Sequence, residues 1–316
     1  MIYFVFSRSS LIEIFAGVER FVSPGATGGS GTSSSPYGSI QEALNAASSN
    51  DIITLYNGTY TGTSNTVLSL RSLTSITIRG YDDDPAKAVI KWTGDSTISF
   101  INMSSNSPTV KLQGLGFTGR MLADNDTLGS TSPTIYVASG TLDMNKCRFD
   151  NFTVSPTSVN TGEVLYVFVT KGAIATIRNS DFIRGTGVYG IQLQQGNITV
   201  STCNFVSHPI ANPAGSCLSI KAGTQTTNFT ITNNNFVSSA SPLYFPRGNI
   251  TLTGNGFYNC TLVVSCGGQN TIISSGNKFC GSSTGSCSSV SVANIRPFDV
   301  CYCYDCFVIL LGMWNM

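Results

Sequence analysis

The amino-acid sequence predicts an all-β solenoid, in which short parallel strands stack in successive turns around one long core. Three observations predict this fold: a recurring pattern of two apolar residues and a phenylalanine, a column of asparagines at a fixed place in that pattern, and a composition poor in charge. Stacked repeats of this kind bury their apolar faces against one another, so none of them needs to be stable alone.

The recurring pattern places two apolar residues, separated by a polar one, seven and five residues before a phenylalanine. Alternation with a period of two indicates a strand with one buried face. The six regular copies are Val110 and Leu112 before Phe117, Leu142 and Met144 before Phe149, Ala175 and Ile177 before Phe182, Ile198 and Val200 before Phe205, Phe229 and Ile231 before Phe236, and Ile250 and Leu252 before Phe257. A seventh, weaker copy has Ile272 before Phe279. A β-sandwich, the alternative fold, does not explain why one register recurs.

The position two residues before each phenylalanine forms a second column. It holds Leu115, Cys147, Ser180, Cys203, Asn234, Asn255 and Asn277. The asparagines occupy three consecutive copies, and stacked amides can hydrogen-bond along the axis as a ladder. Cys147 and Cys203 lie two turns apart, about 9.6 Å at the usual strand spacing, which is too far for a disulfide. We therefore expect an asparagine ladder continued by buried thiols.

Composition excludes several functions. Only 10% of the residues are charged, against about 25% in typical proteins, and the net charge is +1 without a basic stripe. This argues against a nucleic-acid partner. The single histidine, His208, argues against a His-rich zinc site and a Ser-His-Asp triad. We expect no metal and no cofactor. No apolar run reaches the roughly 18 residues that span a bilayer, so no transmembrane span is expected.

Ten cysteines and many Asn-x-Ser/Thr sequons favour an extracellular or cell-surface glycoprotein. The expected glycosylation sites are Asn57, Asn102, Asn125, Asn151, Asn197, Asn228, Asn249 and Asn259. The disulfide candidates are Cys280 with Cys287 and Cys260 with Cys266, because each pair closes a short loop.

The start of the chain carries a family resemblance. Phe21-Val-Ser-Pro-Gly is followed by a segment from Gly31 to Leu44, and then by a strand that ends in Gly-Thr-Tyr60. This order resembles the opening of right-handed parallel β-helix proteins of the pectin lyase-like superfamily. Ser39 and Glu42 form a capping box for a short helix that would cover the first turn.

The chain accordingly divides into three predicted parts. Residues 20–296 form the parallel β-helix domain. Residues 1–19 are expected to be a degraded signal or a disordered N-terminus, and residues 297–316 a Cys-rich C-terminal tail.

The superfamily contains polysaccharide lyases, polygalacturonases, pectin methylesterases and non-catalytic repeat proteins. The segment Asp181-Phe-Ile-Arg184-Gly resembles the Asp-Phe-Ile-x-Gly strand of pectin methylesterases. That resemblance implies a catalytic Asp181 with Arg184 or Arg178 beside it. Phe182, however, already belongs to the phenylalanine column, so the match also has a structural explanation. The motifs expected of the other enzyme classes are absent.

Two hypotheses about function remain open. The main one is a secreted, non-catalytic β-helix that binds, or is displayed on, extracellular glycans or surface proteins. The alternative is a carbohydrate-active enzyme, like a pectin esterase or a lyase, that acts on acidic polysaccharide. The partner is in either case an extracellular polysaccharide or a surface protein. Four tyrosines in strand-like segments could stack on sugars or pack structurally: Tyr136, Tyr166, Tyr189 and Tyr244.

Overall fold

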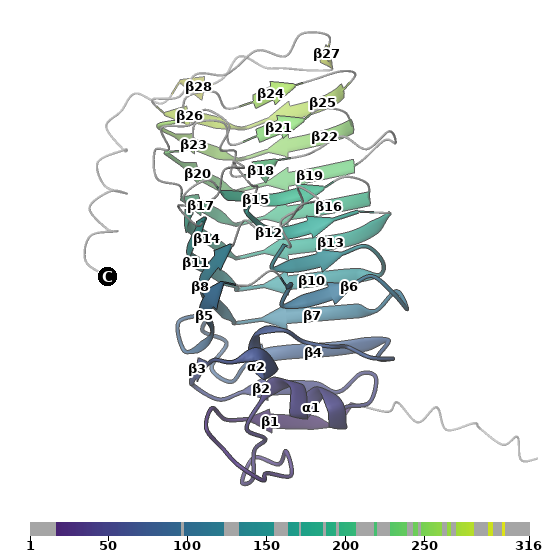
Figure 1. Cartoon of the computed structure of the whole chain (residues 1–316). Helices are drawn as coiled ribbons and strands as arrows, with labels where there is room; N and C mark the ends of the chain where they lie inside the picture. Colours follow the sequence, from purple (N-terminus) through teal and green to yellow (C-terminus); the bar gives the residue numbers. More distant parts are fainter. Residues whose placement is uncertain are drawn as a thin grey trace, which may run out of the picture.

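The computed structural model describes residues 17–95, 98–122, 133–154, 164–170, 172–185, 188–193, 196–206, 218–219, 228–238, 243–245, 248–260, 264–266, 270–280, 290–292 and 299–300. Over these residues the chain is a column of stacked parallel strands, with two short helices at its N-terminal end (Figure 1). The strands belong to three parallel sheets. Each full turn of the solenoid is here called a rung, and the rungs from β4 to β24 add one strand to each sheet. The prediction of a parallel β-helix is confirmed.

Among the described residues, sheet 1 has eleven strands. In spatial order they are β1 (Glu19–Val22), β2 (Ile52–Leu55), β4 (Ser75–Gly80), β7 (Thr109–Gln113), β10 (Thr141–Asn145), β13 (Ala173–Arg178), β16 (Gly196–Ser201), β19 (Asn228–Thr232), β22 (Gly248–Thr253), β25 (Asn270–Ser275) and β27 (Val290–Val292).

Sheet 2 has ten described strands: β3 (Gly58–Tyr60), β5 (Ala88–Asp95), β8 (Gly116–Leu122), β11 (Arg148–Val154), β14 (Asp181–Gly185), β17 (Asn204–Val206), β20 (Asn235–Val237), β23 (Gly256–Tyr258), β26 (Lys278–Cys280) and β28 (Asp299–Val300). Sheet 3 has seven: β6 (Ile101–Met103), β9 (Ile135–Val137), β12 (Val164–Val169), β15 (Val188–Leu193), β18 (Leu218–Ser219), β21 (Leu243–Phe245) and β24 (Val264–Cys266).

The phenylalanine column is the centre of the core. Phe149 pairs in register with Phe182, and the same register continues through Phe205, Phe236 and Phe257. Neighbouring rings from Phe117 to Phe279 stack with centroids 4.7 to 5.2 Å apart. The strand repeat of about 4.8 Å therefore matches the stacking distance of the rings, which explains why phenylalanine recurs on the rungs from β8 to β26.

The asparagine ladder is also confirmed. The Oδ1 atom of Asn255 accepts hydrogen bonds from the backbone N–H and the Nδ2 of Asn234, both at 3.0 Å. The Nδ2 of Asn255 donates to the carbonyl of Ile231 at 2.8 Å and to the Oδ1 of Asn277 at 3.0 Å. All three asparagines are buried. Each amide thus satisfies buried groups on the rungs to either side, as buried polar groups require.

A single left-handed residue turns the chain from sheet 1 into sheet 2 and comes directly before each ladder position. The residues in this place all have φ between 49° and 68°: Gly114, Lys146, Asn179, Thr202, Asn233, Gly254 and Gly276. The N–H groups of the first six donate to carbonyls of the next rung, for example Asn233 to Thr253 at 2.9 Å. The corner is therefore two residues long on each of these rungs.

The N-terminal end is covered by α1 (Ile40–Ala46), as predicted. Ser39 and Glu42 form the expected capping box, and Ile40 and Leu44 are buried. A second helix, α2 (Thr63–Thr66), was not predicted; the Oδ1 of its Asn65 accepts a hydrogen bond from the backbone N–H of Ile40 at 2.9 Å. The helices contact each other and lie against the first strands, so they shield this end of the column.

Candidate functional site

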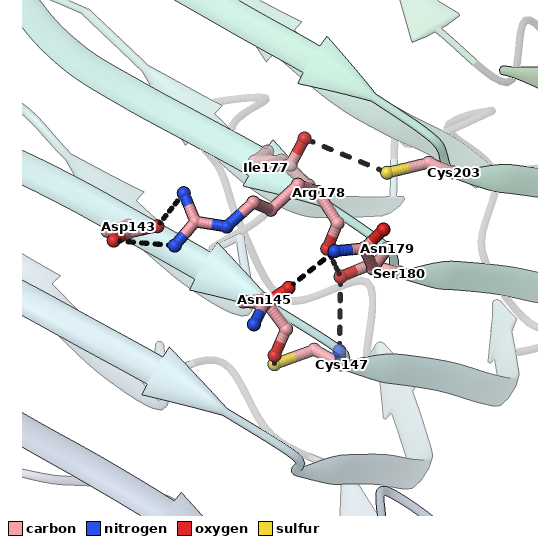
Figure 2. Close-up of polar contacts among 8 residues, drawn as sticks. All are labelled: Asp143, Asn145, Cys147, Ile177, Arg178, Asn179, Ser180 and Cys203. Atoms are coloured by element: carbon pink, nitrogen blue, oxygen red, sulfur yellow. Dashed lines mark hydrogen bonds and ion pairs between the residues drawn. The ribbon is translucent and has the colours of Figure 1, made fainter. Parts of the chain in front are cut away.

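The predicted catalytic residues do not gather into one described site. Asp181 lies on the outer face of sheet 2, where its Oδ1 accepts a hydrogen bond from the Nδ2 of Asn204 at 2.7 Å. Arg178 lies on sheet 1 and pairs instead with Asp143 on the preceding rung, with Nη1–Oδ1 and Nη2–Oδ2 distances of 3.0 and 3.1 Å (Figure 2). Arg184 belongs to β14, but its side chain lies outside the described part. Each described partner therefore fits a structural pair between neighbouring rungs.

Other charged side chains near the corners between sheets 1 and 2 are also paired, within one strand or across two rungs. Arg148, whose strand position is beside Asp181, binds the Oδ2 of Asp150 at 3.0 Å, and Lys146 binds Asp83. These groups are partly exposed, and such pairs contribute only about 0–1 kcal/mol. Within the described ranges no group of three or more His, Cys, Asp or Glu side chains could hold a metal ion.

The outer face of sheet 3 carries an aromatic platform, which we define as Tyr136, Phe168 and the neighbouring Asn102. The three occupy adjacent strands in direct register. The two rings are half-buried and stacked, with centroids 5.6 Å apart and planes 18° apart, and Asn102 is exposed. Their strand neighbours point into the core and are fully buried: Ile101, Met103, Ile135, Val137, Val167 and Val169. The platform thus faces outward from a rigid strand framework.

The structure separates the tyrosines that could stack on sugars. Tyr136 belongs to the platform, whereas Tyr166 is 4% exposed and packs among Phe149, Phe152 and Phe182 in the core. The side chains of Tyr189 and Tyr244 lie outside the described part. Sequence reasoning missed Phe168 because its segment lies outside the phenylalanine repeat. Alternation with the buried Val167 and Val169 was the signal that could have found it.

The two thiols in the ladder column are buried, as predicted. Cys147 and Cys203 are at most 1% exposed, with Ser180 between them in the column. The Oγ of Ser180 accepts a hydrogen bond from the N–H of Cys147 at 3.1 Å, and the thiol of Cys203 donates to the carbonyl of Ile177 (Figure 2). Burial raises the pKa of each thiol to about 12. They are structural and unreactive at neutral pH, because a thiolate is the nucleophile.

Because the pKa values of these two thiols are raised, we expect the free energy of unfolding to fall in alkaline solution. An unfolded thiol ionises near pH 8.5, whereas the folded ones stay protonated to about pH 12. The unfolded state therefore binds fewer protons between these values, and the free energy of unfolding falls by up to about 1.4 kcal/mol per pH unit for each thiol. Urea unfolding at pH 8 and pH 10 measures this. The variant Cys203→Ser should lose less stability over that interval; an equal loss in both proteins would contradict the assignment.

The sequons fall into two structural groups. Asn197, Asn228 and Asn249 are exposed on neighbouring strands of sheet 1, and their side chains hydrogen-bond to one another at 3.0 and 3.1 Å. Asn151, inside β11, and Asn259, directly after β23, are exposed and have φ of 57° and 51°, a conformation that asparagine tolerates. Repeat geometry thus explains asparagine at these five positions, and their glycosylation stays a prediction.

The remaining sequons add little to this picture. The Nδ2 of Asn57 donates to the Oδ2 of Asp82 at 3.0 Å, and Asn102 lies on the platform. Asn125 lies outside the described residues, so its glycosylation too stays a prediction.

The disulfide candidates also stay predictions. Cys260 and Cys280 are buried, but Cys287 and the side chain of Cys266 lie outside the described part. Residues 1–16 and 301–316 lie outside it as well, so the predicted flanking segments are not tested. No described helix is both long and apolar enough to cross a membrane.

Comparisons with known proteins find likenesses among solved structures. No known protein family matches the sequence, and no curated protein matches it significantly. One similar solved structure is an alginate lyase of family PL6, with a TM-score of 0.46 and 16% sequence identity; the match covers 88% of this chain and 40% of that one. Another is a pectate lyase, with a TM-score of 0.43 and 14% identity; the match covers 88% of this chain and 78% of that one. A third is a pectin methylesterase from carrot, with a TM-score of 0.30 and 10% identity; the match covers 87% of this chain and 88% of that one. The chain thus spans less than half of the alginate lyase.

Proposed function

We propose that this protein binds an extended polysaccharide through the aromatic platform on sheet 3. The observation that carries the proposal is the outward-facing stack of Tyr136 and Phe168 beside the exposed amide of Asn102. Aromatic rings offer an apolar face to the C–H groups of a sugar ring, and an amide can both donate and accept hydrogen bonds to sugar hydroxyls.

The arrangement suits a chain-like ligand more than a compact one. The three side chains repeat along the solenoid axis at the strand spacing of about 4.8 Å, and buried valines and isoleucines hold their strands in place. A polymer that runs along the axis meets the same kind of contact on successive rungs. Because the framework is already ordered, little conformational entropy is lost on binding.

Binding is tested by electrophoresis in gels that contain pectin, alginate or a neutral glucan. We expect at least one polysaccharide to retard the protein, and Tyr136→Ala and Phe168→Ala to weaken binding about tenfold, or about 1.4 kcal/mol each. The matched control is Tyr81→Ala, which removes a tyrosine that is 58% exposed elsewhere on the surface. The proposal would be contradicted if the wild type and the three variants were retarded equally, or if no polysaccharide retarded the wild type.

Catalysis on the same polysaccharide is the second candidate. The similar solved structures are named as lyases and an esterase, which corresponds to the enzyme alternative and not to the non-catalytic hypothesis. The same samples should therefore be assayed for released methanol and unsaturated uronides. Activity that disappears in Asp181→Asn, with binding retained, would make Asp181 catalytic and the non-catalytic hypothesis wrong.

A further inference from the structure

The outer face of sheet 1 becomes a regular, uncharged lattice over the strands β16, β19, β22 and β25. We call this surface the hydroxyl face and define it by twelve residues in three columns: Asn197, Asn228, Asn249 and Thr271; Thr199, Thr230, Thr251 and Ile273; Ser201, Thr232, Thr253 and Ser275. Eleven of the twelve are Asn, Thr or Ser. The face lies on a different sheet from the aromatic platform.

The lattice is held rigidly in two directions. Along the axis, the Nδ2 of Asn228 donates to the Oδ1 of Asn197 at 3.0 Å, and the Nδ2 of Asn249 donates to the Oδ1 of Asn228 at 3.1 Å. Across the sheet, the alternate residues of these strands, such as Val200 and Ile231, are completely buried. Threonine is β-branched and has few χ1 rotamers, so its hydroxyl and methyl groups keep fixed positions.

The same sheet carries charges on earlier rungs. Arg79, Lys111, Asp143 and Arg178 lie on its outer face from β4 to β13. From β16 to β25 the equivalent positions hold only uncharged side chains. The change cannot come from the repeat itself, because the buried pattern is the same on both parts. We therefore look for a ligand that requires an uncharged surface.

The repeat distances identify what kind of ligand fits. Neighbouring strands are about 4.8 Å apart, and successive outward residues on one strand are about 6.7 Å apart. A flexible polymer needs regularity in one direction, whereas this face is regular in two. A ligand that matches it is a crystal surface with two similar repeats, and it must be neutral because the face has no charge.

We propose that the hydroxyl face binds the surface of ice. The prism face of hexagonal ice has repeats close to both of these distances and carries no charge. Hydroxyl and amide groups can replace lattice waters as donors and acceptors. The threonine methyl groups fill the spaces between them, and no ionic group is present to hold a hydration shell of its own.

The proposal also explains the three sequons on this face. A lattice with asparagine in one column and threonine in the next generates Asn-x-Thr at 197, 228 and 249. The amides of Asn228 and Asn249 already donate to their neighbours through Nδ2, the atom to which a glycan would be attached. Here the asparagines form part of the lattice, and a glycan would cover it.

Ice binding is tested with protein made in a bacterial host that does not glycosylate asparagine. The measurements are partition into a slowly growing ice front and the gap between melting and freezing temperatures. We expect the wild type to concentrate in the ice and Thr230→Lys to lose at least tenfold of that enrichment. The matched control, Thr59→Lys, places the same charge at an exposed threonine of sheet 2 and should behave like the wild type.

Circular dichroism and urea unfolding show whether each variant is folded, and Thr230→Val, which keeps the shape but loses the hydroxyl, serves if Thr230→Lys does not fold. Wild-type protein that stays in the liquid would overturn the proposal, as would equal partition of the wild type and a folded variant. Binding to crystalline cellulose that Thr230→Lys abolishes, without partition into ice, would assign the face to a polysaccharide instead. The polysaccharide proposal for the aromatic platform is unaffected by any of these results.

Discussion

Replacing Asn255 by alanine should lower the free energy of unfolding by about 3–5 kcal/mol. The amide of Asn255 makes four hydrogen bonds in the buried ladder, two through Oδ1 and two through Nδ2. Without it, the backbone N–H of Asn234 loses its acceptor in a place that water does not reach. An unsatisfied buried group costs about 1–3 kcal/mol, and the lost bonds and the small cavity add to this.

The measurement is urea unfolding followed by circular dichroism, with Asn228→Ala as the control. Asn228 also belongs to an asparagine column with axial hydrogen bonds, but it is exposed on sheet 1. Water can replace its bonds, so the control should lose less than about 1 kcal/mol. Similar losses in both variants would mean that burial does not increase the contribution of the inner ladder to the free energy of unfolding.

Replacing Phe205 by alanine should cost about 3–5 kcal/mol, the usual range for a buried phenylalanine. The ring of Phe205 is completely buried and stacks on Phe182 at 4.8 Å and on Phe236 at 4.9 Å. Truncation leaves a cavity in the middle of the column and exposes two ring faces to it. The packing of neighbouring rungs limits how far the site can collapse.

A comparison with Phe205→Leu separates the effect of lost buried volume on stability from the effect of lost aromatic stacking. Leucine keeps much of the buried surface and removes the aromatic contacts, each of which contributes about 0.5–1.5 kcal/mol beyond burial. We expect this variant to lose about 1–3 kcal/mol, clearly less than alanine in the same urea experiment. A loss below 1 kcal/mol for Phe205→Ala would show that the stack is not essential to the core.

The repeating part of the fold was predictable because three physical requirements act on the same short segment. The apolar pair, the ladder residue and the phenylalanine all lie within eight residues, and each is buried on every regular rung. The N-terminal cap was predictable for the same reason, since Ser39 and Glu42 form a purely local motif. Short-range patterns of this kind do not depend on contacts that only the folded chain creates.

The candidate sites could not be predicted in this way, because they depend on contacts that only the folded chain creates. Asp181 and Arg178 are three residues apart in sequence, yet the corner sends one to sheet 2 and the other to sheet 1, where each finds a partner on a different rung. Tyr136 and Phe168 come together only because β9 and β12 are in register. The strands of sheet 3 follow loops of variable length, so their register cannot be counted from the phenylalanines.

The constant two-residue corner has a consequence for how this molecule can change over evolution. Successive phenylalanines are 21 to 33 residues apart, and none of this variation falls in the corner between sheets 1 and 2. From β7 to β26, the differences in length therefore lie in the other two connections. Along this part of the column one edge has a constant length, whereas the connections on the other sides can lengthen into new loops, and with them contact new partners, without shifting the stack.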